Sequence, residues 1–173
     1  FQKIIFYDTR GVSDAYISAL QAELSPKKIE IEIAASNVDL VKKSDVIITA
    51  TTSLSPVLPD DEDLLRGKSY ISIGAYTPAV REFPDALYKI VDEFYMEEEF
   101  SFIESGDLSY PINSGLMKKE DFIYLSSIIG NPRDNSGKTL CFKSVGIGLF
   151  DLMVAKSIYK GAINSNEGVD FSF

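Results

Sequence analysis

Short apolar runs alternate with helix-like patterns along the first half of the chain. Apolar runs bounded by polar or glycine positions are typical of buried strands, whereas apolar residues at a spacing of three and four indicate helices. Strands are predicted at 3–8, 28–34, 45–51, 70–74 and 89–92, and helices at 14–24, 36–41 and 60–65, with Ser13 and Ser36 as N-caps. This alternation predicts βαβ units and a parallel sheet.

The second half of the chain has a more mixed pattern. The acidic run 96–99 predicts a solvated helix face, and 116–129 predicts a mostly helical segment. A further strand is expected at 139–143, followed by a long, strongly apolar helix over 147–163 that contributes to the core. The end of the chain, 169–173, is predicted to be a strand with no obvious partner.

Composition removes several classes of function. The 173 residues fit one domain, and 17 basic against 26 acidic residues give a net charge of −9, which disfavours nucleic-acid binding. Histidine is absent, so a Ser–His–Asp triad and an imidazole base are excluded within this chain. Cys141 is the only cysteine and is expected in the core. No apolar run reaches about 18 residues, so no membrane span is expected, and the cytoplasm is the expected compartment.

Polar or small residues stand where the predicted strands end, which is where open α/β sheets bind ligands. Asp8 ends the first strand, and a carboxylate there can accept hydrogen bonds from ribose hydroxyls, or it can simply cap its own turn. Arg10, two residues further on, could instead pair with a 2′-phosphate on the ribose. Ser144 precedes the long helix, whose start suits a carboxylate or phosphate, although an N-cap role for Ser144 is the simpler interpretation. Asp107 is predicted in the first turn of a helix capped by Ser105.

An ordered set of these segments resembles one known family. The segments are Tyr7-Asp8-Thr9-Arg10, 44–52, Gly74-Ala75-Tyr76-Thr77-Pro78 with Arg81-Glu82, Val91-Asp92, 104–107, and Phe142-Lys143-Ser144-Val145-Gly146 before a helix with Ala155 and Tyr159. Their order and spacing over about 1–162 are similar to the ornithine cyclodeaminase/mu-crystallin family.

The resemblance implies a particular architecture. Family members join a doubly wound, mainly parallel α/β Rossmann domain for NAD or NADP to a second domain that binds a small amino or imino acid and forms a homodimer. Residues 1–163 then correspond to a partial Rossmann domain that lacks its first strand and glycine-rich phosphate loop. Residues 164–173 correspond to a strand that returns to the second domain.

The resemblance also assigns residues to roles. The ribose-binding acid corresponds to Asp8, and its neighbours Thr9 and Arg10 correspond to residues that tune the choice between NAD and NADP. The cofactor-binding set is Asp8, Thr9, Arg10, Ala50, Thr51, Thr52, Ser72, Ile73, Gly74, Ala75 and Ser144, and the substrate set is Val145 and Gly146.

Two positions depart from the cyclodeaminases of this family. Tyr76 stands in place of an aspartate base two residues before the proline, and Val80 stands in place of a lysine two residues after it. A tyrosine, with a pKa of about 10, cannot accept a proton as a carboxylate does at neutral pH. The resemblance therefore favours hydride transfer at Cα of an imino or amino acid, with Tyr76 as the candidate catalytic residue. The alternatives are ornithine cyclodeaminase proper, a non-catalytic NADPH-binding protein and an unrelated Rossmann-like enzyme.

Overall fold

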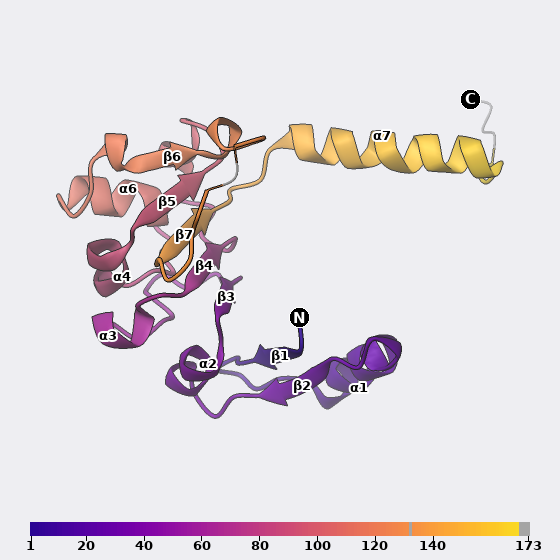
Figure 1. Ribbon diagram of the computed structural model, residues 1–173, viewed down its shortest axis with the longest axis horizontal. Helices are drawn as coiled ribbons and strands as arrows, with labels where there is room; N and C mark the ends of the chain where they lie inside the picture. Colours follow the sequence, from indigo (N-terminus) through magenta and orange to yellow (C-terminus); the bar gives the residue numbers. More distant parts are fainter. Residues whose placement is uncertain (132, 170–173) are drawn as a thin grey trace.

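The computed structural model describes residues 1–131 and 133–169, and these form an α/β structure in which every strand pairing is parallel (Figure 1). The strands are β1 (Lys3–Phe6), β2 (Glu30–Ile33), β3 (Val46–Thr49), β4 (Ser69–Ser72), β5 (Glu93–Met96), β6 (Phe122–Tyr124) and β7 (Leu140–Lys143). The helices are α1 (Asp14–Leu24), α2 (Asn37–Lys43), α3 (Glu62–Leu65), α4 (Asp85–Ile90), α5 (Ser101–Glu104), α6 (Gly106–Asn113) and α7 (Gly148–Ser165), and short 3₁₀ turns occupy Ser25–Lys27, Lys119–Asp121 and Leu125–Ser127.

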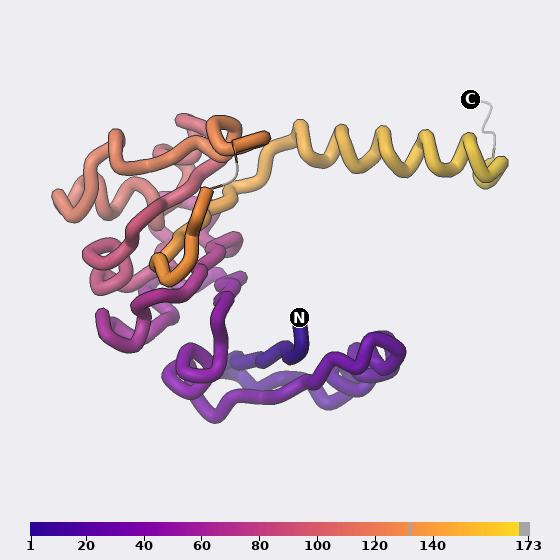
Figure 2. Tube along the Cα trace, viewed as in Figure 1, coloured from indigo at the N-terminus to yellow at the C-terminus, as the bar shows by residue number. Residues whose placement is uncertain are grey.

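The described strands form two separate sheets. One contains β1 and β2, and the other has the order β3-β4-β7-β5-β6. The trace in Figure 2 passes from the smaller sheet through α2 into β3, the first strand of the larger sheet. Within the described residues, β1 pairs only with β2 and β3 only with β4, so each has one edge without a backbone partner. The predicted parallel α/β class is confirmed.

The core lies on one face of the five-stranded sheet. Ile47, Tyr70, Cys141, Phe94 and Phe122 are aligned across the five strands, and all are buried. Apolar side chains from α3, α4, α5 and α6 pack against this row. The alternation of side chains along each strand therefore directs one set inward, as the apolar runs predict.

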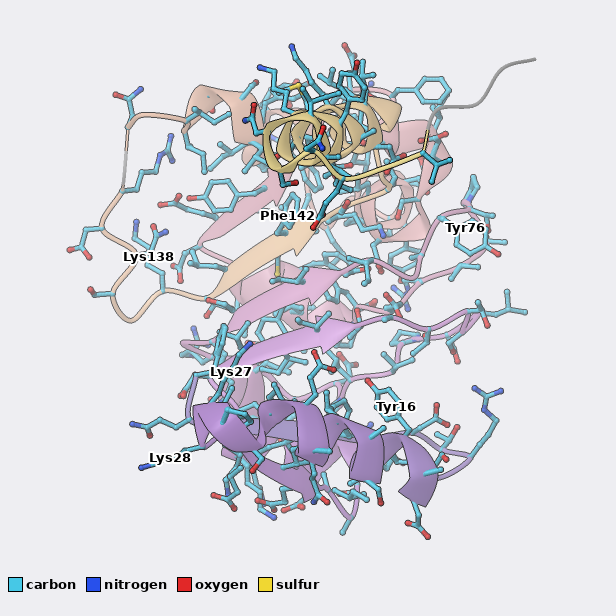
Figure 3. All side chains as sticks on the ribbon, turned by 90° about the vertical axis from the view of Figure 1, so that its right-hand side faces the viewer. Tyr16, Lys27, Lys28, Tyr76, Lys138 and Phe142 are labelled. Atoms are coloured by element: carbon cyan, nitrogen blue, oxygen red, sulfur yellow. The ribbon has the colours of Figure 1, made fainter. Side chains whose placement is uncertain are left out.

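The opposite face of this sheet is only partly covered. Ile48 aligns with Ile71 and Phe142, and the Ile48 side chain is 61% exposed. This is the face turned toward the viewer in Figure 3, where Phe142 is labelled. Parallel sheets are normally covered on both faces, so this row is an apolar surface suited to further protein contacts.

Helix α7 extends away from the sheets (Figure 1). Residues 148–165 form one continuous helix, in agreement with the predicted pattern over 147–163. The expectation that this helix contributes to the core is wrong, because none of its residues is buried. Its apolar side chains, including Leu152, Ile158 and Tyr159, are more than half exposed.

Three local predictions are wrong. The predicted strand 89–92 is not formed, because Lys89 and Ile90 end α4, Val91 is its C-cap, and β5 begins only at Glu93. The acidic run 96–99 is not a solvated helix face, since Met96 ends β5 and Glu97 is buried. Residues 116–129 contain strand β6 between two 3₁₀ turns instead of a helix. In addition, residues 164 and 165 of the C-terminal segment 164–173, which the resemblance makes a strand, belong to α7 instead. Of the predicted terminal strand 169–173, residues 170–173 lie outside the described residues.

Candidate functional site

Most of the predicted site residues lie at the carboxyl ends of parallel strands in the two sheets. The segments that follow β3, β4 and β7 leave the larger sheet in the same direction, because these three strands are parallel, and the segment after β1 leaves the smaller sheet. Exposed residues on these segments are Asp8, Thr9, Arg10, Ala50, Thr51, Thr52, Ile73 and Gly146. Partly buried residues are Gly74, Ser144 and Val145, whereas Ser72 and Ala75 are buried.

Asp8 follows β1 and is held by its own turn. Its Oδ1 accepts the Arg10 backbone N–H at 2.7 Å and Arg10 Nε at 3.4 Å. These hydrogen bonds, with the backbone one the stronger cause, lower the pKa of the Asp8 carboxyl below its ordinary value. The other oxygen, Oδ2, meets no hydrogen-bond donor among the described residues, so it is available to hydroxyl groups of a ligand.

The ends of β3 and β4 are in direct backbone contact. A Cβ built on Gly74 would lie 2.1 Å from the carbonyl oxygen of Thr51, so only glycine fits between the two segments. Ala50, Thr51 and Thr52 remain exposed beside this contact. The side chain of Ser72 does not reach this surface, because it is fully buried and directed into the protein.

Beneath these two strand ends lies a buried carboxylate that sequence reasoning did not single out as a site residue. Glu82 is fully buried in the loop between β4 and α4. Its Oε1 accepts the Thr51 N–H at 2.6 Å. Its Oε2 accepts the Thr49 hydroxyl at 2.8 Å, the Ser72 hydroxyl at 2.9 Å and the Gly74 N–H at 3.0 Å. One side chain therefore joins both strand ends.

Asp107 forms a second layer behind Glu82. Its Oδ1 accepts the backbone N–H groups of Glu82 at 2.8 Å and Phe83 at 3.0 Å. Its Oδ2 lies 2.6 Å from the Ser72 hydroxyl, which also contacts Glu82. A hydroxyl carries a single hydrogen, so a proton on Asp107 Oδ2, donated to Ser72, accounts for both contacts. Burial raises the pKa of Asp107, in keeping with this arrangement.

Lys143 completes the buried polar row at the end of β7. Its ammonium donates to the Ser144 carbonyl at 2.7 Å and to the Ser72 carbonyl at 3.3 Å. Burial lowers its pKa, and the nearby Asp107, Glu82 and Glu97 oppose that shift. Thr49, Ser72 and Lys143 align across β3, β4 and β7 on the core side, so the apolar core changes to a polar row at its carboxyl end.

The segment after β7 is held by a third buried acid, Glu97. Glu97 accepts the hydroxyl of Ser144 and, at 3.0 Å, the N–H of Val145. Ser144 is therefore not an N-cap of α7, because Ile147 occupies that position and provides no side-chain cap. The Val145 N–H is already paired, so any backbone donors for a ligand lie at the first turn of α7 instead.

The two departures from the cyclodeaminase pattern have different surroundings. The Tyr76 side chain is 60% exposed on the loop after β4 (Figure 3). Val80 is buried, so its position faces the core and not the ligand surface.

Within the described residues, no helix has the length and apolarity to cross a bilayer. Over the same residues, acids and Cys141 do not gather into a metal-binding group.

Parallel strands linked by helices, with polar segments at their carboxyl ends, define a Rossmann-like α/β domain. The chain belongs to the ornithine cyclodeaminase/mu-crystallin family, whose family model matches residues 2–166. The resemblance drawn from the sequence is thereby confirmed.

The chain is similar to several named members of this family. It is 31% identical over 178 residues to a Delta(1)-pyrroline-2-carboxylate reductase of Bacillus thuringiensis, an alignment that covers 99% of this chain and 53% of the relative. It is 28% identical to the ketimine reductase mu-crystallin of Mus musculus, with 87% and 44% covered. The chain thus spans about half the length of the curated relatives it matches.

Solved structures agree on the fold. A Thermococcus litoralis Delta(1)-pyrroline-2-carboxylate reductase in complex with NADH and L-proline matches with a TM-score of 0.80 and 25% identity, over 98% of this chain and 53% of that chain. An iminosuccinate reductase of Paracoccus denitrificans in complex with NAD+ has a TM-score of 0.82 at 22% identity, over 100% and 52%.

Proposed function

We propose that this chain is the dinucleotide-binding part of an NAD(P)-dependent oxidoreductase that transfers hydride at Cα of a small imino or amino acid. The observation that carries the proposal is the set of exposed residues that follow the parallel strands β3, β4 and β7 of the larger sheet and β1 of the smaller one. The names of the relatives and the NADH and NAD+ of the solved structures support the same reaction class.

The residues at these strand ends fit a dinucleotide. Asp8 Oδ2 can accept hydrogen bonds from ribose hydroxyls, and Arg10 can pair with a 2′-phosphate. Ala50, Thr51 and Thr52 offer small, exposed side chains, and the backbone of Thr51 is in close contact with Gly74. When bound, the dinucleotide donates or accepts the hydride, and these residues would orient it.

The substrate would lie near the start of α7. The first-turn N–H groups of Gly148 and Leu149 face no side-chain cap, so they can bind a carboxylate. The two predicted substrate residues, Val145 and Gly146, would lie beside these N–H groups. Tyr76, exposed after β4, is the proposed proton donor to the substrate nitrogen.

The open edges and faces support a larger assembly. A parallel strand between β1 and β3 would join the two sheets into one, and a glycine-rich loop after such a strand would supply phosphate contacts. The exposed apolar side of α7 suits the second, substrate-binding domain and a homodimer contact. We assign residues 1–163 to the dinucleotide domain and residues 164–173 to the second domain. We also propose that the enzyme is cytoplasmic and has no nucleic-acid or membrane partner.

Reduction is favoured over cyclodeamination by a specific feature. The cyclodeaminase pattern requires an aspartate and a lysine, and this chain has an exposed Tyr76 and a buried Val80 there. A non-catalytic NADPH-binding protein would share the dinucleotide surface but show no turnover.

The proposal is tested by titrating the full-length gene product with NADH and NADPH, using nicotinamide fluorescence. Saturable binding of at least one, followed by oxidation of the cofactor with Δ1-pyrroline-2-carboxylate or a related ketimine, is the expected result. Binding without turnover across imino, amino and keto acids would favour the non-catalytic alternative. A folded protein that binds neither cofactor would contradict the proposal.

A further inference from the structure

Glu82 occupies an unusual position for a buried acid. It touches no exposed surface, yet each of its four hydrogen-bond donors belongs to a strand end that carries proposed cofactor-binding residues. Thr49 and Thr51 come from the end of β3, and Ser72 and Gly74 come from the end of β4. Along the sequence, Thr51 is 31 residues from Glu82 and Gly74 is 8 residues from it.

The geometry points to Glu82 as a positioning residue that fixes the two strand ends against which the dinucleotide lies. This inference rests on the proposed function, which places the cofactor on those segments. Glu82 acts through the backbone N–H groups of Thr51 and Gly74, and so sets the direction of the peptide planes beside the proposed cofactor surface. It has no contact with the ligand itself.

The carboxylate chemistry at this position is specific. All four groups around Glu82 donate, and a carboxylate only accepts, so every contact is satisfied. A glutamine of the same size would place an NH₂ group against at least one of these donors. If its oxygen stayed with the three donors at Oε2, the NH₂ would face the Thr51 N–H and push that peptide away. The fold could remain while the strand end moved.

The loop that carries Glu82 is itself fixed from behind. Asp107 accepts the N–H groups of Glu82 and Phe83, and Gly106 N donates to the Thr77 carbonyl at 3.0 Å. The carboxylate is therefore held at its backbone by α6 and at its oxygens by β3 and β4. A side chain held at both ends transmits its position to the groups it binds.

The test compares Glu82→Gln with Thr139→Val in the full-length gene product. Thr139 is also buried, and its hydroxyl accepts the Gly67 N–H at 2.9 Å, but it precedes β7 at the opposite end of the sheet. E82Q is expected to raise the Kd of NADH or NADPH, whichever binds, about tenfold. T139V is expected to change that Kd less than twofold. In steady state, E82Q should raise the KM for the cofactor while the KM for Δ1-pyrroline-2-carboxylate changes less than twofold.

The outcomes separate the inference from the proposed function. If the wild-type protein binds neither cofactor, the proposed function fails and this inference fails with it. If the wild type binds and a folded E82Q variant binds equally well, or T139V weakens binding as much, only the role of Glu82 is overturned. Should E82Q not fold, Thr49→Val removes one of the four donors and is expected to raise the Kd about threefold. An unchanged Kd in T49V would then overturn the role.

Discussion

Glu97, the residue after β5, accepts a hydrogen bond from the hydroxyl of Ser144, the residue after β7. Glu97 also accepts the Val145 N–H at 3.0 Å, so one buried carboxylate fixes the whole start of the segment that leads to α7. This segment carries residues proposed to meet both the cofactor and the substrate.

Replacing Ser144 by alanine removes the hydroxyl from this contact. The buried Glu97 oxygen is then left without its donor, and we expect a loss of about 2 kcal/mol in the free energy of unfolding. Urea unfolding of the full-length protein measures this loss. Ser127→Ala is the control, because that hydroxyl donates to the Tyr124 carbonyl on an exposed turn. Equal stability of S144A and S127A would contradict the importance of the Glu97 contact.

Glu93 predicts a pH dependence of stability. Hydrogen bonds from Lys138, then from Tyr95 and Arg133, lower the pKa of Glu93 from 4.5 to about 2. A carboxyl group with a lowered folded-state pKa stabilises the protein above its unfolded pKa, and this contribution is lost as the pH falls through the folded value. Glu93→Gln should therefore be less stable than wild type at pH 7, and the difference should shrink between pH 4.5 and about 2.

Unfolding midpoints at several pH values test this expectation. Glu23→Gln, on the exposed side of α1, provides the comparison. A stability difference between E93Q and wild type that stays constant down to pH 2 would show that the ion pairs of Glu93 do not contribute as described.

Gly74→Ala is expected to be strongly destabilising. The new Cβ would lie 2.1 Å from the Thr51 carbonyl oxygen and 2.4 Å from its nitrogen, and backbone atoms cannot move aside easily. We expect a loss of about 3 kcal/mol or failure to fold. Gly161→Ala in α7 is the matched control, since a Cβ there meets nothing within 4 Å and helix propensity favours alanine. A G74A protein as stable as G161A would rule out the close contact of β3 and β4.

Asp8 and Arg10 predict opposite effects on cofactor preference. Asp8→Ala removes the acceptor for ribose hydroxyls and should weaken NADH binding about tenfold. Arg10→Ala removes the cation that would face a 2′-phosphate, so it should weaken NADPH binding and leave NADH binding within about twofold. Fluorescence titration with both cofactors measures each effect. Equal changes for the two cofactors in both variants would argue against this position of the adenosine ribose.

Tyr76→Phe tests the proposed proton donor. Loss of the hydroxyl should lower kcat about a hundredfold, which is within the usual contribution of a general acid, and should leave cofactor binding unchanged. Tyr16→Phe, an exposed tyrosine on α1, serves as the control (Figure 3). Unchanged turnover in Y76F would remove the acid role and leave Tyr76 as a wall of the site.

The repeating strand–helix order could be predicted from sequence because strand and helix periodicities leave local patterns. Ser13, Ser36 and Ser105 are predictable as caps for the same reason, and each accepts a backbone N–H in the first turn of its helix. The strand prediction over 89–92 is wrong because a short apolar stretch fits the end of a buried helix as well as a strand.

The buried acids of the site could not be predicted in this way. Glu97 stands in a run of acidic residues that is typical of a solvated surface, and only its pairing with a segment 47 residues away explains its burial. Glu82 likewise binds Thr51, 31 residues away. The cap motif at Ser105 is the sequence signal that comes closest to this cluster of buried acids. It correctly predicts that Asp107 lies in the first turn of a helix.

Helix α7 has a practical consequence for handling the polypeptide. It presents Leu149, Leu152, Val154, Ile158 and Ile163 to water along eighteen residues that bury nothing. Apolar surfaces of this kind adsorb to each other and to hydrophobic dyes and chaperones. The 173-residue chain in isolation should therefore self-associate despite its net charge of −9. Covering this one helix should make it monodisperse.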